Sequence, residues 1–245
     1  MWGSSRPDAG FIAIDDVIFY DSKCEVLPSK AQVNAGDCSF DRDLCNYRRT
    51  EDGDRLGNWQ LAIAGERLLR NMADHTYNNP AGGYAYFDIY DTNQRKIRLI
   101  SPVIEPPRDE DDRACLAFWF HPLGSGDSTT LQLMQRIGDS NEVVENDEKM
   151  TPLWKVQTHQ LDRSRDDWMF GQVEIDNSRT FRLIFEGIAT KGGFAIDDIQ
   201  IYTNQQKEGC NTRPAYAANP DRNGQVVESS NGNIRGQSAA STDPA

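Results

Sequence analysis

The sequence predicts an all-β protein, built as an antiparallel β-sandwich with jelly-roll topology and tied by disulfides. Short segments with alternating apolar and polar residues follow one another from Cys38 to Cys210. Turn sequences rich in Gly and Pro separate these segments, and the sequence has no sustained apolar pattern with the 3.6-residue period of a helix. Many short strands joined by such turns are typical of sandwiches and jelly rolls.

Seven segments carry the strand signal. The run Cys115–His121 is almost continuously apolar, which is typical of a central strand. The other expected strands span residues 84–90, 131–137, 154–158, 173–175, 181–186 and 195–202. Breakers such as Pro106–Pro107 and Gly192–Gly193 lie between them. We therefore expect the last two segments to be separate strands, divided at the paired glycines.

A short motif occurs twice and indicates the domain boundaries. Ala-Ile-Asp-Asp occupies Ala13–Asp16 and again Ala195–Asp198, about one domain length apart, and a cysteine follows each copy. We therefore interpret residues 1–24 as the C-terminal remnant of a preceding domain, residues 25–37 as a linker and residues 38–210 as one complete domain. Residues 211–245 are a polar tail or linker with too little apolar surface to fold, so we expect disorder there.

Charge and hydropathy exclude several classes of partner. The chain has 245 residues and a formal net charge of −12. Phosphate binding needs clustered Lys and Arg, so this charge argues against nucleic acid and against an anionic membrane surface. No apolar run approaches the roughly 18 residues of a transmembrane helix, and the first residues lack the apolar stretch of a signal peptide. Together with the partial repeat, this predicts a fragment whose signal lies upstream.

The five cysteines favour disulfides over a zinc site. None forms a Cys-x-x-Cys motif, and no histidine lies at zinc-ligand spacing from them. Cys38, Cys45, Cys115 and Cys210 fall in the complete domain and can form two disulfides, with three pairings open. Cys24 follows the partial repeat, so its partner would lie upstream. The odd count fits a truncated, disulfide-bonded array from an oxidising compartment.

A set of short motifs runs in order through residues 38–210. They are Cys38-Ser-Phe-Asp41 with Cys45, Asn58-Trp59, Asp74-His75-Thr76, Gly83–Tyr86, Leu99–Pro102, Cys115–Phe120, and Gly193–Ile199 with Cys210. In this order they resemble the motifs of the MAM domain, an extracellular module named for meprin, A5/neuropilin and receptor phosphatase mu. Residues 10–24 resemble the end of a second such domain.

The resemblance implies a disulfide pairing and a candidate cation site. The implied pairs are Cys38–Cys45 and Cys115–Cys210. The implied cation is a structural Ca²⁺ between the opening strand and the Asp-His-Thr loop, with Asp41 and Asp74 as the first ligands and Asp197 as the third; carboxylate oxygens suit this ion. In a strand, Asp197 and Asp198 point to opposite faces, so at most one of them can enter a given site. The alternative is that these aspartates cap turns or bond backbone amides.

We expect no catalytic site. Asp74 and His75 are adjacent, but the sequence lacks Gly-x-Ser-x-Gly, His-Glu-x-x-His and Gly-x-Gly-x-x-Gly, which favours a structural histidine. The resemblance implies a non-catalytic extracellular adhesion module of a cell-surface or secreted multidomain protein. Its partners would be cell-surface proteins or a second copy, with no nucleic acid and no membrane insertion by this segment.

Two other functions stay open. One is a jelly-roll carbohydrate-binding module, in which at least two of the candidate tryptophans would be exposed on one concave face and stack on sugars. The candidates are Trp59, Trp119, Trp154 and Trp168. At strand spacing, tryptophans more commonly belong to the core. The other is an accessory domain of a larger extracellular enzyme.

Overall fold

The computed structural model describes residues 13–15, 33–50, 57–63, 72–79, 82–106, 113–124, 126, 128–138, 150–162, 167–203 and 210–217. The chain divides into two units, residues 1–32 and residues 33–245. In the first unit, Ala13–Asp15 are described, and Ile14 is 73% exposed. The rest of the expected remnant, residues 25–32 of the expected linker and residues 218–245 of the expected tail lie outside the described residues.

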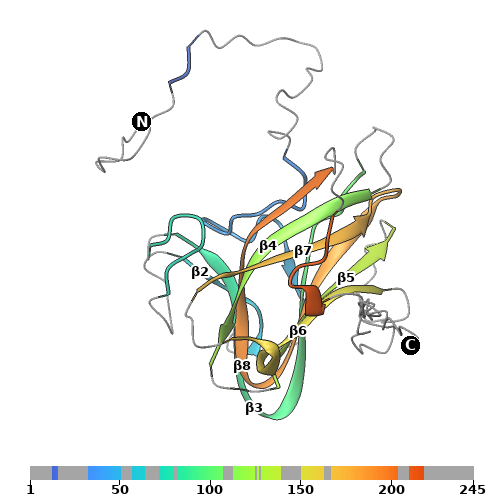
Figure 1. Ribbon diagram of the computed structural model, residues 1–245. Coiled ribbons are helices and arrows are strands. Elements are labelled where there is room, and N and C mark those ends of the chain that lie inside the picture. The colour runs from blue at the N-terminus through green and yellow to red at the C-terminus, as the bar shows by residue number, and fades with distance from the viewer. Residues whose placement is uncertain are drawn as a thin grey trace, which may run out of the picture. The chain divides into compact units, whose positions relative to one another are not determined.

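The described part of the second unit consists of β-strands and two short 3₁₀ helices, with no α-helix (Figure 1). The strands are β1 (Arg48–Arg49), β2 (Gln60–Ala62), β3 (Tyr84–Ile100), β4 (Arg113–Leu123), β5 (Thr130–Ile137), β6 (Thr151–Gln157), β7 (Met169–Asp176) and β8 (Phe181–Thr203). The 3₁₀ helices are η4 (Thr158–Gln160) and η5 (Ala215–Ala217). Across these described ranges, no helix has the length and apolar character needed to span a membrane.

The two longest strands, β3 and β8, run through both layers of a sandwich. They pair with each other antiparallel on both sides of a bend. Residues 181–188 of β8 also pair with β5, which pairs with β6; with β1, these strands form what we call the β5 layer. Residues 193–203 of β8 pair with β4, which pairs with β7; with β2, these form the β4 layer. The predicted all-β antiparallel sandwich of jelly-roll type is confirmed.

Each long strand bends where it passes between the layers. In β3 the pairing register shifts between Tyr90 and Arg95, so the predicted strand 84–90 continues to residue 100. In β8, Gly192 has a φ of 96°, and a Cβ on Gly193 would lie 1.6 Å from the carbonyl oxygen of Phe87. The expected break at these glycines is wrong, because they let one continuous strand bend while β3 stays close to it.

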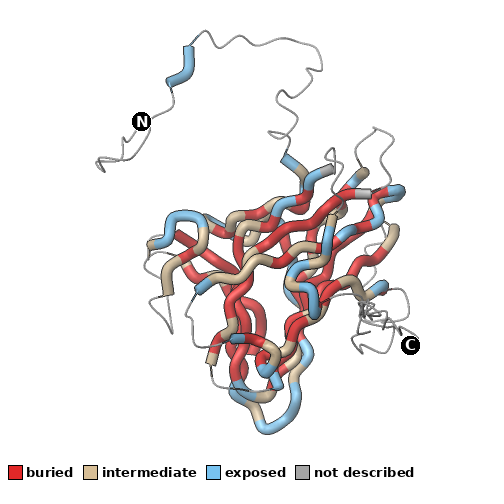
Figure 2. The backbone as a smooth tube through the Cα atoms, viewed as in Figure 1, coloured by how far each residue is buried: buried red, intermediate tan, exposed pale blue. Residues whose placement is uncertain are grey.

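Much of the backbone in both layers belongs to buried residues (Figure 2). Aromatic residues from both layers fill the interior. The Phe118 ring of β4 meets Trp154 of β6 and Phe185 of β8 edge-on, at centroid distances of 5.0 and 5.2 Å. Such edge-to-face contacts add to the free energy gained by burying the rings. β4 lies between β8 and β7, so the prediction that Cys115–His121 is a central strand is confirmed.

One ion-pair cluster is buried on the outer face of the β5 layer. The Glu186 carboxylate is completely buried and accepts hydrogen bonds from Arg98 Nε at 2.6 Å and from Gln132 Nε2 at 2.5 Å. Lys96 Nζ lies 3.5 Å from the same carboxylate. Because burying an ionised carboxylate is costly, these partners are what allow Glu186 to occupy the middle of the layer.

The folded domain begins before Cys38. Asn34 Nδ2 donates a hydrogen bond to the Ile201 carbonyl oxygen at 2.6 Å, and the Ile201 N–H donates to Asp37 Oδ1 at 2.8 Å. Cys38 then exchanges two backbone hydrogen bonds with Ile199. Residues 33–37 of the expected linker therefore pack along the end of β8 and belong to the domain.

The domain also continues past Cys210. The backbone of Arg213 exchanges two hydrogen bonds with Gln172 of β7, at 2.8 and 3.0 Å, and Trp154 Nε1 of β6 donates to the Arg213 carbonyl oxygen at 2.8 Å. Ala217 is completely buried in the core. We call residues 210–217 the C-terminal clasp, because they join the edge strands of the two layers. The first seven residues of the expected tail are therefore folded.

Candidate functional site

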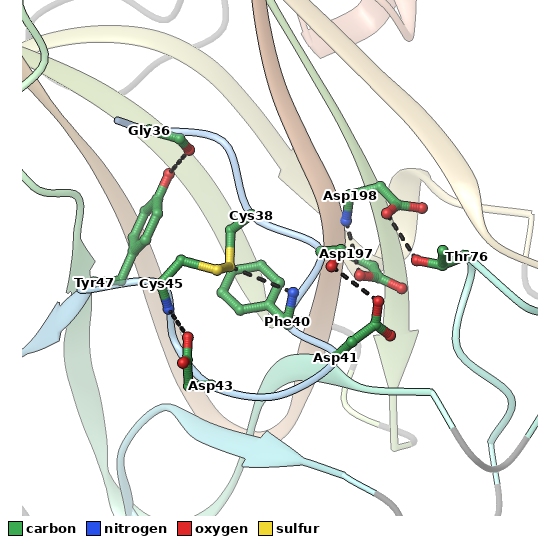
Figure 3. The surroundings of a disulfide bond; sticks show 11 residues. Gly36, Cys38, Phe40, Asp41, Asp43, Cys45, Tyr47, Thr76, Asp197 and Asp198 are labelled. Carbon is green, nitrogen blue, oxygen red and sulfur yellow. Dashed lines mark hydrogen bonds between the residues drawn. A yellow bond between two sulfur atoms is a disulfide. The ribbon is translucent and has the colours of Figure 1, made fainter. Parts of the chain in front are cut away.

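The opening turn of the domain is closed by a disulfide between Cys38 and Cys45, with an S–S distance of 2.01 Å (Figure 3). Within this turn Phe40 and Cys45 have φ values of 53° and 48°, in the left-handed region that costs most residues energy. Phe40 is completely buried. The disulfide therefore holds this strained turn against the core. Asp41, the first candidate cation ligand, lies within the turn.

A second disulfide joins Cys115 in β4 to Cys210 at the start of the C-terminal clasp, with an S–S distance of 1.95 Å and a sequence separation of 95. Both pairs are those that the family resemblance implies. The second one fastens the clasp to a central strand, so the end of the domain is tied covalently to the β4 layer. Two disulfides fit an extracellular, oxidising location.

Asp41 faces the paired glycines that precede β3. Its Oδ1 accepts a hydrogen bond from the Gly83 N–H at 3.2 Å. A Cβ on Gly83 would lie 2.2 Å from the Phe40 carbonyl oxygen, and a Cβ on Gly82 would lie 2.1 Å from the Asp74 carboxylate. Only glycine fits such close approaches. Gly82 and Gly83 therefore let the chain pass directly between Asp41 and Asp74.

Asp74 organises the loop of residues 72–79, which carries the Asp-His-Thr motif. Its side chain is completely buried. Oδ2 accepts a hydrogen bond from the Tyr77 N–H at 2.7 Å, and Oδ1 accepts one from the Asn79 N–H at 3.1 Å. Short acidic side chains commonly stabilise turns in this way. The loop is therefore held in a defined shape by its own aspartate.

Two further carboxylates from β8 hold the same loop. Asp197 Oδ2 accepts a hydrogen bond from the His75 N–H at 2.9 Å. Asp198 Oδ2 lies 2.6 Å from His75 Nδ1, and its Oδ1 accepts a hydrogen bond from Thr76 Oγ1 at 2.8 Å. Strand alternation predicts opposite faces for these two side chains, yet both contact the same loop. The reason is local: Asp198 has a φ of 47° at a register shift between β4 and β8, and such a bulge interrupts the alternation of side chains.

The electrostatics of the site centre on Asp197. Its side chain is completely buried. Its pKa is raised to about 8, mainly by this burial and also by the neighbouring charges of Asp198 and Asp74, against the lowering effect of the hydrogen bonds from the backbone N–H groups of His75 and Asp198. The site therefore holds more negative charge than its own hydrogen bonds neutralise, and a proton or a cation at Asp197 would relieve the repulsion.

The structure brings only part of the candidate cation site together. Asp74 and Asp197 are close enough to affect each other's charge, and Asp41 meets Asp74 only through the intervening glycines. Within the described ranges, no three His, Cys, Asp or Glu side chains are placed so that they could hold a metal ion. The backbone hydrogen bonds that all three carboxylates accept are what the turn-capping alternative predicts. A Ca²⁺ here would need backbone carbonyls and water beside at most two carboxylates.

An aromatic cluster that the sequence did not predict surrounds the loop. The His75 ring stacks on Trp119 with a centroid distance of 3.8 Å and an interplanar angle of 16°. Trp119 also contacts Phe170 of β7 at 5.2 Å. Trp168 donates a hydrogen bond through Nε1 to the Ala73 carbonyl oxygen at 3.0 Å and meets His75 edge-on. All four rings are partly exposed.

The four candidate tryptophans therefore divide into two pairs. Trp59 and Trp154 are completely buried and belong to the core. Trp119 and Trp168 lie on the outer face of the β4 layer, where His75 covers one face of the Trp119 indole. Alternation along β4 is the signal that separates Trp119 from the core, because the residues on either side of it, Phe118 and Phe120, both point inward.

Fold and disulfides define the class of this protein: a two-layer antiparallel β-sandwich tied by two disulfides. The family model "MAM domain, meprin/A5/mu" matches residues 38–211, so the chain belongs to the MAM domain family. The matched interval includes the candidate site and both disulfides.

Two relatives are neuropilins. The chain is 27% identical over 197 residues to Neuropilin-1a of Danio rerio, which is 76% of this chain and 20% of that protein. It is 27% identical over 144 residues to Neuropilin-1 of Gallus gallus, which is 57% of this chain and 14% of that protein. The chain thus spans a fifth or less of the length of these relatives.

Two solved structures show a weaker likeness. The K1 cleaved adhesin domain of Lys-gingipain from Porphyromonas gingivalis W83 has 16% identity and a TM-score of 0.47, covering 69% of this chain and 97% of that one. TmCBM61, solved with β-1,4-galactotriose, has 14% identity and a TM-score of 0.40, covering 64% and 88%. At these scores neither likeness bears on the fold or the function of this chain.

Proposed function

We propose that the chain is a non-catalytic protein-interaction module in the extracellular part of a secreted or cell-surface multidomain protein. Its partners are cell-surface proteins or a second copy of the same domain. The observation that carries this proposal is the rigidly held loop of residues 72–79. Three aspartates fix its backbone and side chains, while Tyr77 within it is 58% exposed.

A fixed loop with an exposed aromatic side chain suits protein recognition. Ordering a flexible loop on binding costs free energy, and a loop that is already ordered avoids this cost. Tyrosine supplies a large contact area with few rotatable bonds and is enriched at binding hot spots. The partly exposed ring of His75, within this loop, stacks on the partly exposed Trp119, and the two extend the contact area.

The test is a binding comparison between two tyrosine variants. Beads coated with the domain report contacts between copies, and a fluorescent tetramer of the domain applied to cells reports contacts with other proteins. Tyr77→Ala should weaken whichever contact is present by about tenfold or more, which corresponds to about 1.4 kcal/mol. Tyr90→Ala is the matched control, because Tyr90 is similarly exposed, at 63%, on the bend of β3. Equal loss in both variants, or no binding in either assay, contradicts the proposal.

A structural Ca²⁺ at the aspartate site is the second part of the proposal. Asp74 and Asp197 would be its carboxylate ligands. Asp41, on the other side of Gly82 and Gly83, would be a third carboxylate near the ion. Support comes from the buried Asp197, whose raised pKa reflects burial and repulsion by neighbouring carboxylates. The oxygen-only donors match the preference of Ca²⁺. The ion would neutralise the cluster and stiffen the loop of residues 72–79, with no part in a reaction.

Calcium titration tests this part separately. At 100 times its Kd, a bound ion stabilises the native state by about 2.7 kcal/mol, which raises the melting temperature. Asp197→Asn should abolish the rise, whereas Asp91→Asn at the exposed bend of β3 should leave it intact. The rise should also be larger at pH 8 than at pH 6, because a proton competes with the ion for Asp197. An unchanged melting temperature in millimolar calcium contradicts the cation and leaves the protein-interaction proposal standing.

A further inference from the structure

Side chains from β4, β7, β8 and the C-terminal clasp share one face of the β4 layer. Within the layer Ala117 of β4 pairs with Gln200 of β8 and with Gln172 of β7, which in turn pairs with Arg213 of the clasp. Residues directly opposite each other in antiparallel strands point to the same side. Ala117 alternates with the core residues Leu116 and Phe118, so this row of side chains faces outward. The next row holds Tyr202, opposite Cys115.

The side chain of Tyr202 extends along this outer face toward β7. Its hydroxyl donates a hydrogen bond to Gln172 Oε1 at 3.0 Å, although Tyr202 is on β8 and Gln172 is two strands away on β7. Neighbouring strands are about 4.8 Å apart, so the side chain has to reach across β4 to meet that partner. The β4 residues between them are Ala117 and Cys115, which is bonded to Cys210; they are only 8% and 1% exposed.

The ring is anchored at its hydroxyl and is partly exposed. Gln172, which accepts the phenol hydrogen bond, also donates through Nε2 to the Asn211 carbonyl oxygen at 2.9 Å. Tyr202 is 38% exposed. A partly exposed aromatic ring that reaches across a strand and is anchored at its hydroxyl is a preformed platform, because little rotamer freedom has to be lost when something stacks on it.

A positive charge borders this platform. The backbone of Arg213 is held by two hydrogen bonds to Gln172 and by the Trp154 indole, while its side chain is exposed. Burial raises the pKa of the Tyr202 phenol, and the Arg213 charge lowers it. Glu174 of β7, which is exposed and lies opposite Cys115 as Tyr202 does, adds a carboxylate to the same face. The exposed amide of Gln200 lies on the opposite side of the row.

We propose that this Tyr202 platform binds a single acidic sugar at the end of an otherwise neutral glycan. The pyranose ring would stack on Tyr202, because the negative face of an aromatic ring attracts the weakly positive C–H groups on the flat side of a sugar. The sugar carboxylate would pair with the Arg213 guanidinium, whose planar fork matches it. The Gln200 and Gln172 amides would bond the sugar hydroxyls.

Size and charge favour this ligand over two others. A stable protein interface needs about 800 Å² on each side, whereas one ring, one guanidinium and two amides match one or two sugar residues. A highly sulfated polysaccharide would be repelled by the formal net charge of −12 and by the exposed Glu174 on this face, whereas a single carboxylate can pair with Arg213 at the other side of Gln172. This site lies at the end of β8, apart from Tyr77, and does not rest on the protein-interaction proposal.

The test uses sialyllactose as the acidic probe and lactose as its neutral counterpart, measured by saturation-transfer NMR and titration. Sialyllactose should bind more tightly than lactose. Tyr202→Ala and Arg213→Gln should each weaken sialyllactose binding by about tenfold or more, and Arg213→Gln should remove the difference between the two probes. Tyr90→Ala is the control, since it removes a more exposed tyrosine from another part of the surface. Melting temperatures establish that each variant is folded.

Three results would overturn the proposal. The first is no binding of sialyllactose by the unaltered protein. The second is an equal loss in Tyr90→Ala and Tyr202→Ala. The third is cell binding that depends on Tyr202 but persists after sialidase treatment, which would assign this face to a protein. Loss of binding in Tyr77→Ala alone leaves the glycan proposal unaffected, so the two hypotheses fail independently.

Discussion

The two disulfides should differ in how much they stabilise the domain. We consider two double variants, Cys115→Ala with Cys210→Ala and Cys38→Ala with Cys45→Ala, both in a Cys24→Ser background that prevents thiol–disulfide exchange. Alanine is chosen because Cys38 and Cys115 are 5% and 1% exposed, and a serine hydroxyl would be buried there. Each pair loses two sulfur atoms, so the packing losses are similar.

The difference comes from the unfolded chain. The Cys115–Cys210 disulfide closes a loop with a sequence separation of 95, and Cys38–Cys45 closes one with a separation of 7. Loop-closure entropy then gives a stabilisation of about 4.7 kcal/mol for the first and about 2.4 kcal/mol for the second at 25 °C. In the native state, the clasp keeps its backbone hydrogen bonds to Gln172 and its buried Ala217 without the disulfide, so we expect little native rearrangement.

Urea unfolding measures the two free energies. The fluorescence of Trp59 and Trp154, both completely buried, reports the transition. The long-loop variant should lose about 2 kcal/mol more stability than the short-loop variant. It should also unfold with a larger dependence on urea, because its unfolded chain is freer to expand. Equal losses, or a larger loss in the short-loop variant, would refute the loop-entropy argument and show that the strained opening turn decides stability.

Two further predictions concern buried charge. Glu186→Gln should lower the free energy of unfolding by about 3–5 kcal/mol in urea titrations, because it removes the carboxylate that pairs with the buried Arg98. Lys96→Ala changes a residue whose side chain is 46% exposed and should lower the free energy of unfolding by less than about 1 kcal/mol. Similar losses in both variants would contradict the argument that burial makes the Glu186–Arg98 pair the important one. Asp197 has a pKa of about 8 in the folded state, raised from about 3.9, so its contribution to stability is largest below pH 4 and is lost as the pH rises to 8. In calcium-free buffer, unfolding titrations should show this loss, up to roughly 5 kcal/mol, and Asp197→Asn should remove it; a variant with the same pH dependence as the parent would show that Asp197 is ionised throughout.

The sequence predicts the fold class well for a local reason. Alternation of apolar and polar residues reports which side chains face the core, and Leu116, Phe118 and Phe120 of β4 follow it closely. Glycines are less informative, because Gly192–Gly193 mark a bend in a continuous strand as readily as a turn between two. Which of these they do depends on β3 lying 1.6 Å from the position of a Cβ on Gly193, a contact that the sequence does not contain.

The candidate site is predictable in composition but not in arrangement. The motifs name Asp41, Asp74 and Asp197 as unusual carboxylates, and the structure places all three around the loop of residues 72–79 and the glycines that follow it. Strand alternation predicts that Asp198 lies on the opposite face from Asp197. Its positive φ brings it to His75 instead, and a bulge of that kind arises from the pairing of β8 with β4.

By itself, the sequence determined the protein's class: an all-β disulfide-bonded domain of the MAM family, with four cysteines available for two bridges. These properties follow from residue identity and spacing, which are local. Only the tertiary structure decided that residues 33–37 and 211–217 pack with the domain, how Asp197 and Asp198 are oriented, and that Tyr202 reaches across β4. Each of these depends on a partner far away along the chain, such as Gln172 for Tyr202 and Arg213, and spacing carries no information about such partners.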